Sequence, residues 1–159
     1  MTLRDVAIYN LSPGCTCAIR NDVKDLFLSS RCALPHDWTL SIIAACKDGL
    51  YYLDQATTEY RIYDQNTIGL GHEKEYEKRK RDVNLNFLEK RSMIEIVRKY
   101  KKRDSEDYKY CQRVVAVFLL RKKAMENRSV RFALSALMRS FGMSYLYESV
   151  LLDLITIVK

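Results

Sequence analysis

The residue types that could take part in chemistry are concentrated between His36 and Gly69, a stretch that begins HDWTLSIIAACKDG. Near its start the acidic Asp37 stands next to the aromatic Trp38, at a predicted helix start. A carboxylate in such a place can accept a proton, or it can cap and charge the first turn of the helix. Considered without its neighbours, Asp37 favours the capping interpretation, because that use of aspartate is common.

A second group later in the same stretch consists of Tyr60, Arg61 and Asn66. A guanidinium presents a fork of N–H donors that suits phosphate oxygens. An arginine on an edge strand followed by an asparagine in a turn explains the same residues equally well. Gly14 and Thr16 leave a similar choice open, since a small residue lets a substrate approach the backbone, and a glycine also suits the turn into a strand.

The order of these motifs resembles the order found in family 2 glycosyltransferases of the rhamnosyltransferase type. The resemblance rests on SPGCTCAIR from Ser12, on HDW, on YLD from Tyr52, and on YR from Tyr60 followed by Asn66. It covers about residues 5 to 71. Because these motifs come in the order found in the family, the interpretation of the acidic residue changes from a helix cap to a catalytic group.

Two positions depart from the family pattern. Tyr63 stands where the family usually has histidine, so a metal or diphosphate contact that depends on that imidazole is put in question. Gln55 and Ala56 replace the common Glu-Pro pair, which we interpret as a change of turn.

The resemblance implies inverting transfer of a sugar from a nucleotide-sugar donor to a glycan acceptor, in surface polysaccharide synthesis. Asp37 is implied to be the general base that takes the proton from the acceptor hydroxyl, in surroundings shaped by His36 and by Trp38 as a platform for a sugar ring. The other implied substrate-binding residues are Gly14 and Thr16 under the acceptor, Arg61 as a phosphate or loop-positioning residue, and Asn66 as a residue that orders the loop.

A family 2 enzyme also has a nucleotide-binding half with an acidic DxD metal motif. This chain contains no DxD sequence and no glycine-rich phosphate loop. The resemblance therefore implies a divalent cation, Mg²⁺ or Mn²⁺, whose main ligands lie outside this chain. We expect the isolated chain to be inactive or nearly so.

The elements that must position these residues predict an α/β fold, which the resemblance implies to be an incomplete half of a GT-A type glycosyltransferase. Short apolar, β-branched and aromatic runs predict strands at 15–19, 50–54 and 57–63. Helical spacing predicts helices over about 21–29 and from Pro35 to an end at Gly49.

The second half of the chain predicts about four amphipathic helices. The first spans about 72–103, and the second begins after Asp104 or Ser105. The third runs from Val130 to Gly142, and the fourth covers 143–158. The predicted organisation is therefore a catalytic-domain part over 1–71 and a helical C-terminal extension over 72–159.

Composition narrows the setting of the chain. Its 159 residues, 48% of them hydrophobic, suit one ordinary folded domain. Five cysteines in no zinc-like array indicate free thiols in a reducing compartment, and His72 has no ligand-like partners. No run approaches the ~18 apolar residues of a membrane span, so we expect a cytoplasmic protein, with peripheral contact at the inner face of the membrane as a further expectation.

The positive charge belongs to the second half of the chain. Residues 1–70 carry six Lys or Arg against eight Asp or Glu, whereas residues 71–159 carry 21 against 12. The acids and bases alternate at helical spacing, which favours a solvated helix face. The alternative function is a non-catalytic helical module that binds a membrane surface or a partner subunit. Nucleic acid is not an expected partner, because the chain has no recognisable binding motif.

Overall fold

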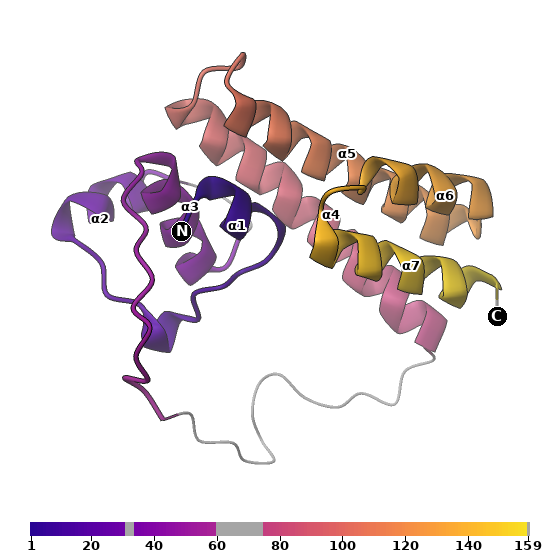
Figure 1. Ribbon diagram of the computed structural model, residues 1–159, viewed down its shortest axis with the longest axis horizontal. Helices are drawn as coiled ribbons and strands as arrows, with labels where there is room; N and C mark the ends of the chain where they lie inside the picture. The colour runs from indigo at the N-terminus through magenta and orange to yellow at the C-terminus, as the bar shows by residue number, and fades with distance from the viewer. Residues whose placement is uncertain (31–33, 60–74, 159) are drawn as a thin grey trace.

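The computed structural model describes residues 1–30, 34–59 and 75–158, and over these residues it is helical (Figure 1). It contains seven α-helices, one short 3₁₀ helix and no strand among the described residues. The elements are α1 (Leu3–Ile8), η1 (Gly14–Thr16), α2 (Asn21–Leu28), α3 (His36–Cys46), α4 (Glu75–Tyr100), α5 (Glu106–Asn127), α6 (Val130–Arg139) and α7 (Ser144–Val158).

The long helices α4 and α5 run side by side in opposite directions and form the axis on which the other helices pack (Figure 1). Of the two predicted cap residues, Asp104 and Ser105, the structure shows Ser105, whose side chain accepts a hydrogen bond from the backbone N–H of Tyr108 at 3.3 Å. Glu106 and Asp107 add negative charge to the first turn of α5, where the helix dipole favours it.

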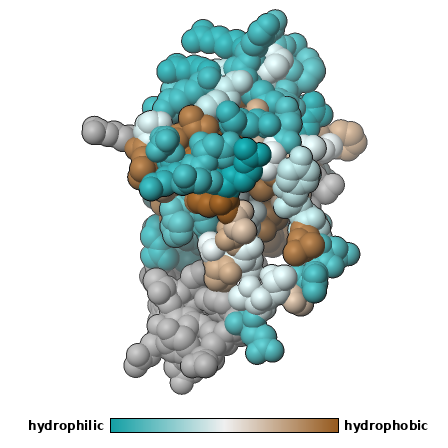
Figure 2. Space-filling model, turned by 90° about the vertical axis from the view of Figure 1, so that its left-hand side faces the viewer, coloured by the Kyte–Doolittle hydropathy of each residue, from teal (hydrophilic) through white to brown (hydrophobic). Residues whose placement is uncertain are grey.

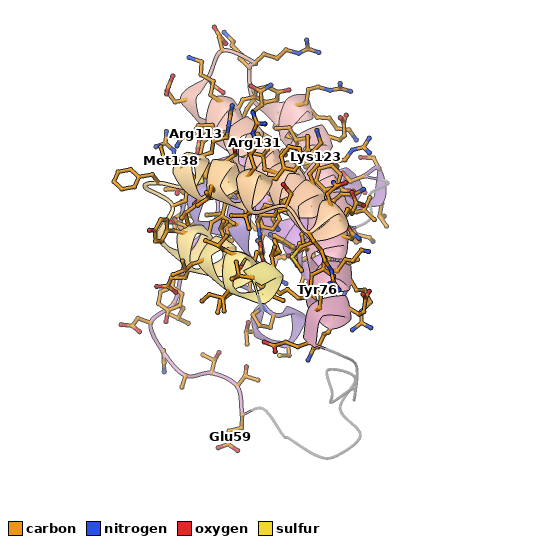
Figure 3. All side chains as sticks on the ribbon, turned by 90° about the vertical axis from the view of Figure 1, so that its right-hand side faces the viewer. Glu59, Tyr76, Arg113, Lys123, Arg131 and Met138 are labelled. Carbon is orange, nitrogen blue, oxygen red and sulfur yellow. The ribbon has the colours of Figure 1, made fainter. Side chains whose placement is uncertain are left out.

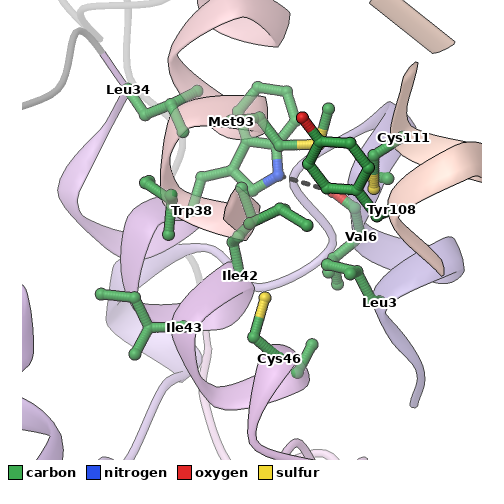
Figure 4. Close-up of a cluster of buried hydrophobic side chains, with 14 residues drawn as sticks. Leu3, Val6, Leu34, Trp38, Ile42, Ile43, Cys46, Met93, Tyr108 and Cys111 are labelled. Carbon is green, nitrogen blue, oxygen red and sulfur yellow. Dashed lines mark hydrogen bonds between the residues drawn. The ribbon is translucent and has the colours of Figure 1, made fainter. Parts of the chain in front are cut away.

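The first hydrophobic core joins the N-terminal helices to α4 and α5 (Figure 4). Val6 of α1 and Ile42 of α3 are fully buried there, together with Met93 and Val97 of α4 and Cys111 of α5. The two predicted parts of the chain, 1–71 and 72–159, thus contribute to one core.

The second core lies at the other end of the α4–α5 pair, under α6 and α7. Val117 and Phe118 of α5 are fully buried against Ala136 of α6 and against Leu146 and Val150 of α7. Among the described helices, none is long and apolar enough to cross a lipid bilayer.

The predicted α/β fold is wrong for the described residues. The predicted strand at 15–19 is replaced by η1 and the irregular chain after it, and residues 50–59 run without a ladder partner. The predicted strand at 57–63 lies only partly within the described residues. A strand needs a neighbouring strand for its backbone hydrogen bonds, whereas a helix makes them within itself. Strand-like composition without a partner therefore leaves an irregular segment.

The end of α3 differs from the prediction in one detail. The helix ends at Cys46, and the left-handed residue that follows is Asp48, with φ of 54°, rather than Gly49. The backbone N–H of Gly49 still donates to the carbonyl of Ala44 at 2.9 Å, which completes the turn.

Candidate functional site

The candidate site is centred on Asp37, in the first turn of α3. Its carboxylate is half-buried, and each of its oxygens accepts a backbone N–H. Oδ1 accepts from Trp38 at 2.8 Å, a helix-start N–H without a partner inside the helix. Oδ2 accepts from Gly14 at 3.0 Å. The carboxylate thus supports the helix start, and each oxygen keeps capacity for a further donor.

Gly14 brings the N-terminal motif against the start of α3. A Cβ atom placed on Gly14 would lie 3.1 Å from His36 Nε2 and 3.6 Å from the Cβ of Asp37. The absence of a side chain at Gly14 therefore permits this close approach. The structure thus brings together three of the predicted site residues, from two motifs that are 23 positions apart.

Thr16 lies in η1 and is exposed, but its hydroxyl is engaged in the turn itself. The hydroxyl donates to the carbonyl oxygen of Pro13 at 2.8 Å, as does its backbone N–H at 2.8 Å. Cys17, at the end of this turn, is half-buried. Burial, together with the nearby Asp37 carboxylate, raises the pKa of the Cys17 thiol, which therefore stays protonated near neutral pH.

Trp38 lies in the first core instead of at the surface (Figure 4). It is only 4% exposed, and its indole N–H donates to the carbonyl oxygen of Val6 at 2.7 Å. The Nζ atom of Lys90 lies 3.8 Å from the centre of its ring. In this structure the indole positions α3 against α1 and α4, and its face is covered by the lysine rather than open to a sugar.

The second predicted group falls outside the described residues. Tyr60, Arg61, Tyr63 and Asn66 all belong to this part of the chain, as do Gly69 and His72. Their predicted roles stay predictions.

The surface around the candidate site is mixed in character. Figure 2 looks onto the left-hand side of Figure 1, where α2 lies, and shows apolar side chains in patches among hydrophilic ones. Within the same N-terminal part, Tyr51, Tyr52 and Leu53 are strongly exposed on the irregular segment after α3. Thr58 returns toward η1, where its hydroxyl donates to the carbonyl oxygen of Cys15 at 3.5 Å.

No metal set accompanies the carboxylate. Over the described residues, no three His, Cys, Asp or Glu side chains come close enough together to hold a metal ion. The chemistry available at Asp37 is therefore that of a carboxylate oriented by two backbone N–H groups.

Lys90 was not singled out from the sequence, although it is a buried ionisable residue that lies over the ring of Trp38. Its side chain is fully buried, and its Nζ has no hydrogen-bond partner. Burial is the main cause that lowers the pKa of Lys90 to about 7; Glu89 opposes this shift and Arg121 adds to it. The sequence could have indicated this burial, because Lys90 lies between Phe87 and Ile94 at the helical spacing of the apolar stripe, where an apolar residue is expected.

Comparisons of this chain with protein-family models, with curated proteins and with solved structures found no match. The glycosyltransferase assignment thus depends on the motifs quoted above.

Proposed function

We propose that this chain carries the catalytic carboxylate of an inverting glycosyltransferase that uses a nucleotide-sugar donor and a glycan acceptor. The observation that carries the proposal is the contact between Gly14 and Asp37, with the Gly14 N–H 3.0 Å from Oδ2. Two of the four motifs that carry the family resemblance meet at this contact, and the acidic residue of the pair is half-buried and held in one orientation.

In the proposed reaction Asp37 acts as the general base. Its carboxylate takes the proton of the acceptor hydroxyl while that oxygen bonds to the anomeric carbon of the donor sugar. The bond from the anomeric carbon to the nucleoside diphosphate breaks on the opposite face, and the diphosphate leaves with the electron pair. Two backbone N–H donors fix the carboxylate before substrate binds, so little reorganisation is needed.

The donor site is assigned to residues outside this chain. This part of the proposal rests on the sequence, which contains no DxD motif and no glycine-rich phosphate loop. A nucleotide-binding half would supply the donor site together with the divalent cation. The isolated chain is then expected to transfer no sugar.

The test is the Asp37→Asn substitution in the protein joined to its nucleotide-binding half, with transfer measured from radiolabelled nucleotide-sugars. We expect the transfer rate to fall by about 10²–10⁴-fold, the usual contribution of a general base, with donor binding unchanged. Asn keeps one oxygen that can accept a backbone N–H, so the melting temperature should change by only a few degrees, about 1 kcal/mol.

Asp25→Asn is the matched control, because Asp25 is an exposed aspartate on α2. It should leave both the transfer rate and the melting temperature unchanged. If Asp37→Asn lowers the melting temperature but keeps the transfer rate, the carboxylate only stabilises the helix start. If the isolated chain transfers sugar by itself, the assignment of the donor site to another part is wrong.

A further inference from the structure

The amphipathic helix α6 exposes several large apolar side chains to solvent. Four exposed residues lie three or four positions apart on and just after the helix, and we call them the α6 face: Val130, Leu134, Met138 and Phe141. Met138 and Phe141 are each 80% exposed. The side of α6 that packs on the molecule is formed by the buried Ala133 and Ala136, with Leu137 packed against the second core beside them. The apolar side chains of the α6 face therefore remain available for a partner outside the described structure.

The surroundings of the α6 face are basic. The sequence from residue 127 to residue 147 contains no Asp or Glu, but it includes Arg131 and Arg139 in α6 itself. Arg113 of α5 lies near Met138, and Figure 3 shows Arg113, Arg131 and Lys123 along the same side of the α5–α6 pair. Among the described residues, Arg113, Arg131 and Arg139 have no acidic side chain within salt-bridge distance. Their guanidinium groups are therefore not neutralised by the described part of the protein.

A shallow open groove lies at the end of the α6 face. It is lined by Lys109, Gln112, Arg113, Met138, Arg139 and Phe141. Lys109 is paired with Glu106 at 2.8 Å, so among the described residues the guanidinium groups of Arg113 and Arg139 are the cations of this groove without an acidic partner. Two such cations beside two exposed apolar side chains suit the surface of a phospholipid bilayer, where phosphate head groups meet acyl chains.

We infer that the α6 face docks on an anionic phospholipid membrane. Met138 and Phe141 enter the boundary between head groups and acyl chains, while Arg113, Arg131 and Arg139 contact the lipid phosphates. Arginine suits this role, because its apolar stem can lie along the acyl boundary while the guanidinium binds phosphate by two hydrogen bonds. The inference does not depend on the proposed glycosyl transfer.

A membrane fits this surface better than an acidic protein does. The two most exposed apolar side chains are each 80% exposed at an open groove, and Arg113 and Arg139 line the same groove. An apolar strip of this kind with a basic border is typical of helices that lie in the membrane interface. Protein interfaces instead centre on a packed apolar cluster from which water is excluded.

The test measures binding of the full chain to vesicles of phosphatidylcholine, alone or mixed with phosphatidylglycerol. We expect co-sedimentation only with the anionic vesicles, weakened as the salt concentration rises. The double variant M138E/F141E and the double variant R131E/R139E should each weaken this binding about tenfold or more. All four positions are exposed, so the fold and its circular dichroism should be retained.

The matched control is L85E/L88E, which places the same charges at two exposed leucines on α4. It should leave vesicle binding unchanged. A second readout is Phe141→Trp, whose fluorescence should be quenched by lipids brominated in the acyl chain, whereas the buried Trp38 of the parent protein should not respond. Equal binding to neutral and anionic vesicles, equal loss in the control variant, or no quenching at residue 141 would each overturn the inference. Self-association that M138E/F141E abolishes, without any vesicle binding, would assign the surface to a protein contact instead.

Discussion

At the scale of single residues, Lys90 is an ionisable side chain that is fully buried between Trp38 of the first core and Phe118 of the second. Its Nζ lies between two aromatic rings, 3.8 Å from the ring centre of Trp38 and 4.9 Å from that of Phe118. Aromatic faces favour the ammonium, whereas complete burial without a hydrogen-bond partner disfavours it. Burial is the larger effect, and it lowers the pKa of Lys90 to about 7.

The buried lysine should make stability depend on pH. In the unfolded chain the lysine has its ordinary pKa of 10.5, so between about pH 7 and pH 10.5 the unfolded state holds a proton that the folded state has lost. The contribution of this group to the free energy of unfolding therefore rises with pH across that window. Below about pH 7 the destabilisation caused by burying the charged lysine is fully present. Burial also raises the pKa values of Cys46 and Cys111 to about 12, which lowers stability above their ordinary value of 9.0. The lysine is best isolated below that pH.

Lys90→Met should raise the free energy of unfolding at pH 6.5 by about 2 kcal/mol, because an apolar chain of similar length replaces an unpaired buried amine. Urea titrations from pH 6.5 to pH 8.5 should show stability rising in the parent protein and a smaller slope in the variant. Lys78→Met, on the exposed side of α4, is the control and should change neither value. An unaltered slope in Lys90→Met would show that the lysine is charged in the folded state throughout this range.

At the scale of secondary structure, a buried polar cluster ties α4, α5 and α7 together. Asp153 is fully buried and accepts from Arg121 Nε at 2.5 Å and from Arg79 Nε at 2.6 Å. The hydroxyl oxygen of Ser149 accepts from both arginines, at 2.9 Å from Arg121 and 3.1 Å from Arg79. One carboxylate and one hydroxyl on α7 thus satisfy two guanidinium groups from two other helices.

Asp153→Asn should be among the most destabilising single changes on α7. It leaves the guanidinium of Arg121, 3% exposed, without a counter-charge, which costs about 3–5 kcal/mol in buried pairs. Ser149→Ala removes only a neutral acceptor and should cost about 1 kcal/mol. Asp82→Asn is the control, because Asp82 pairs with Arg81 at 3.9 Å at the surface. This substitution should change the free energy of unfolding by less than about 0.5 kcal/mol. Urea denaturation checks the order, and equal effects at Asp153 and Asp82 would contradict it.

The helices from α2 onward were predicted well, because a helix is specified by local spacing and caps, whereas α1 (Leu3–Ile8) was not predicted. The apolar spacing and Ser105 located α5, and the short apolar repeat located α3. Over the described residues the strand predictions are wrong, because local composition says nothing about whether a partner strand is present. The same spacing places Trp38, Ile42 and Cys46 on one side of α3, which already indicated a buried indole rather than a sugar platform. Order of motifs, not spacing, suggested that Gly14 and Asp37 belong together.

At the scale of the whole molecule, the two predicted parts of the chain share a hydrophobic core. The first core takes α1 and α3 from the N-terminal part and α4 and α5 from the C-terminal part. Removing either part would expose the apolar side chains of the other, so neither has an independent core at this end of the molecule. The described residues should therefore unfold as one cooperative unit.

The single tryptophan provides a direct measurement of this cooperativity. Trp38 fluorescence reports on the contact of α3 with α1 and Lys90, whereas the far-ultraviolet circular dichroism is dominated by α4 and α5, the two longest helices. In urea the two signals should change at the same midpoint. Ile42→Ala in the first core and Val117→Ala in the second should lower the stability by about 2–4 and 1–3 kcal/mol, and each should move both signals together. A fluorescence midpoint at a lower urea concentration than the circular-dichroism midpoint would mean that the N-terminal helices unfold separately. A fluorescence midpoint that Ile42→Ala shifts and Val117→Ala does not would mean the same. In either case the shared core contributes little to cooperativity.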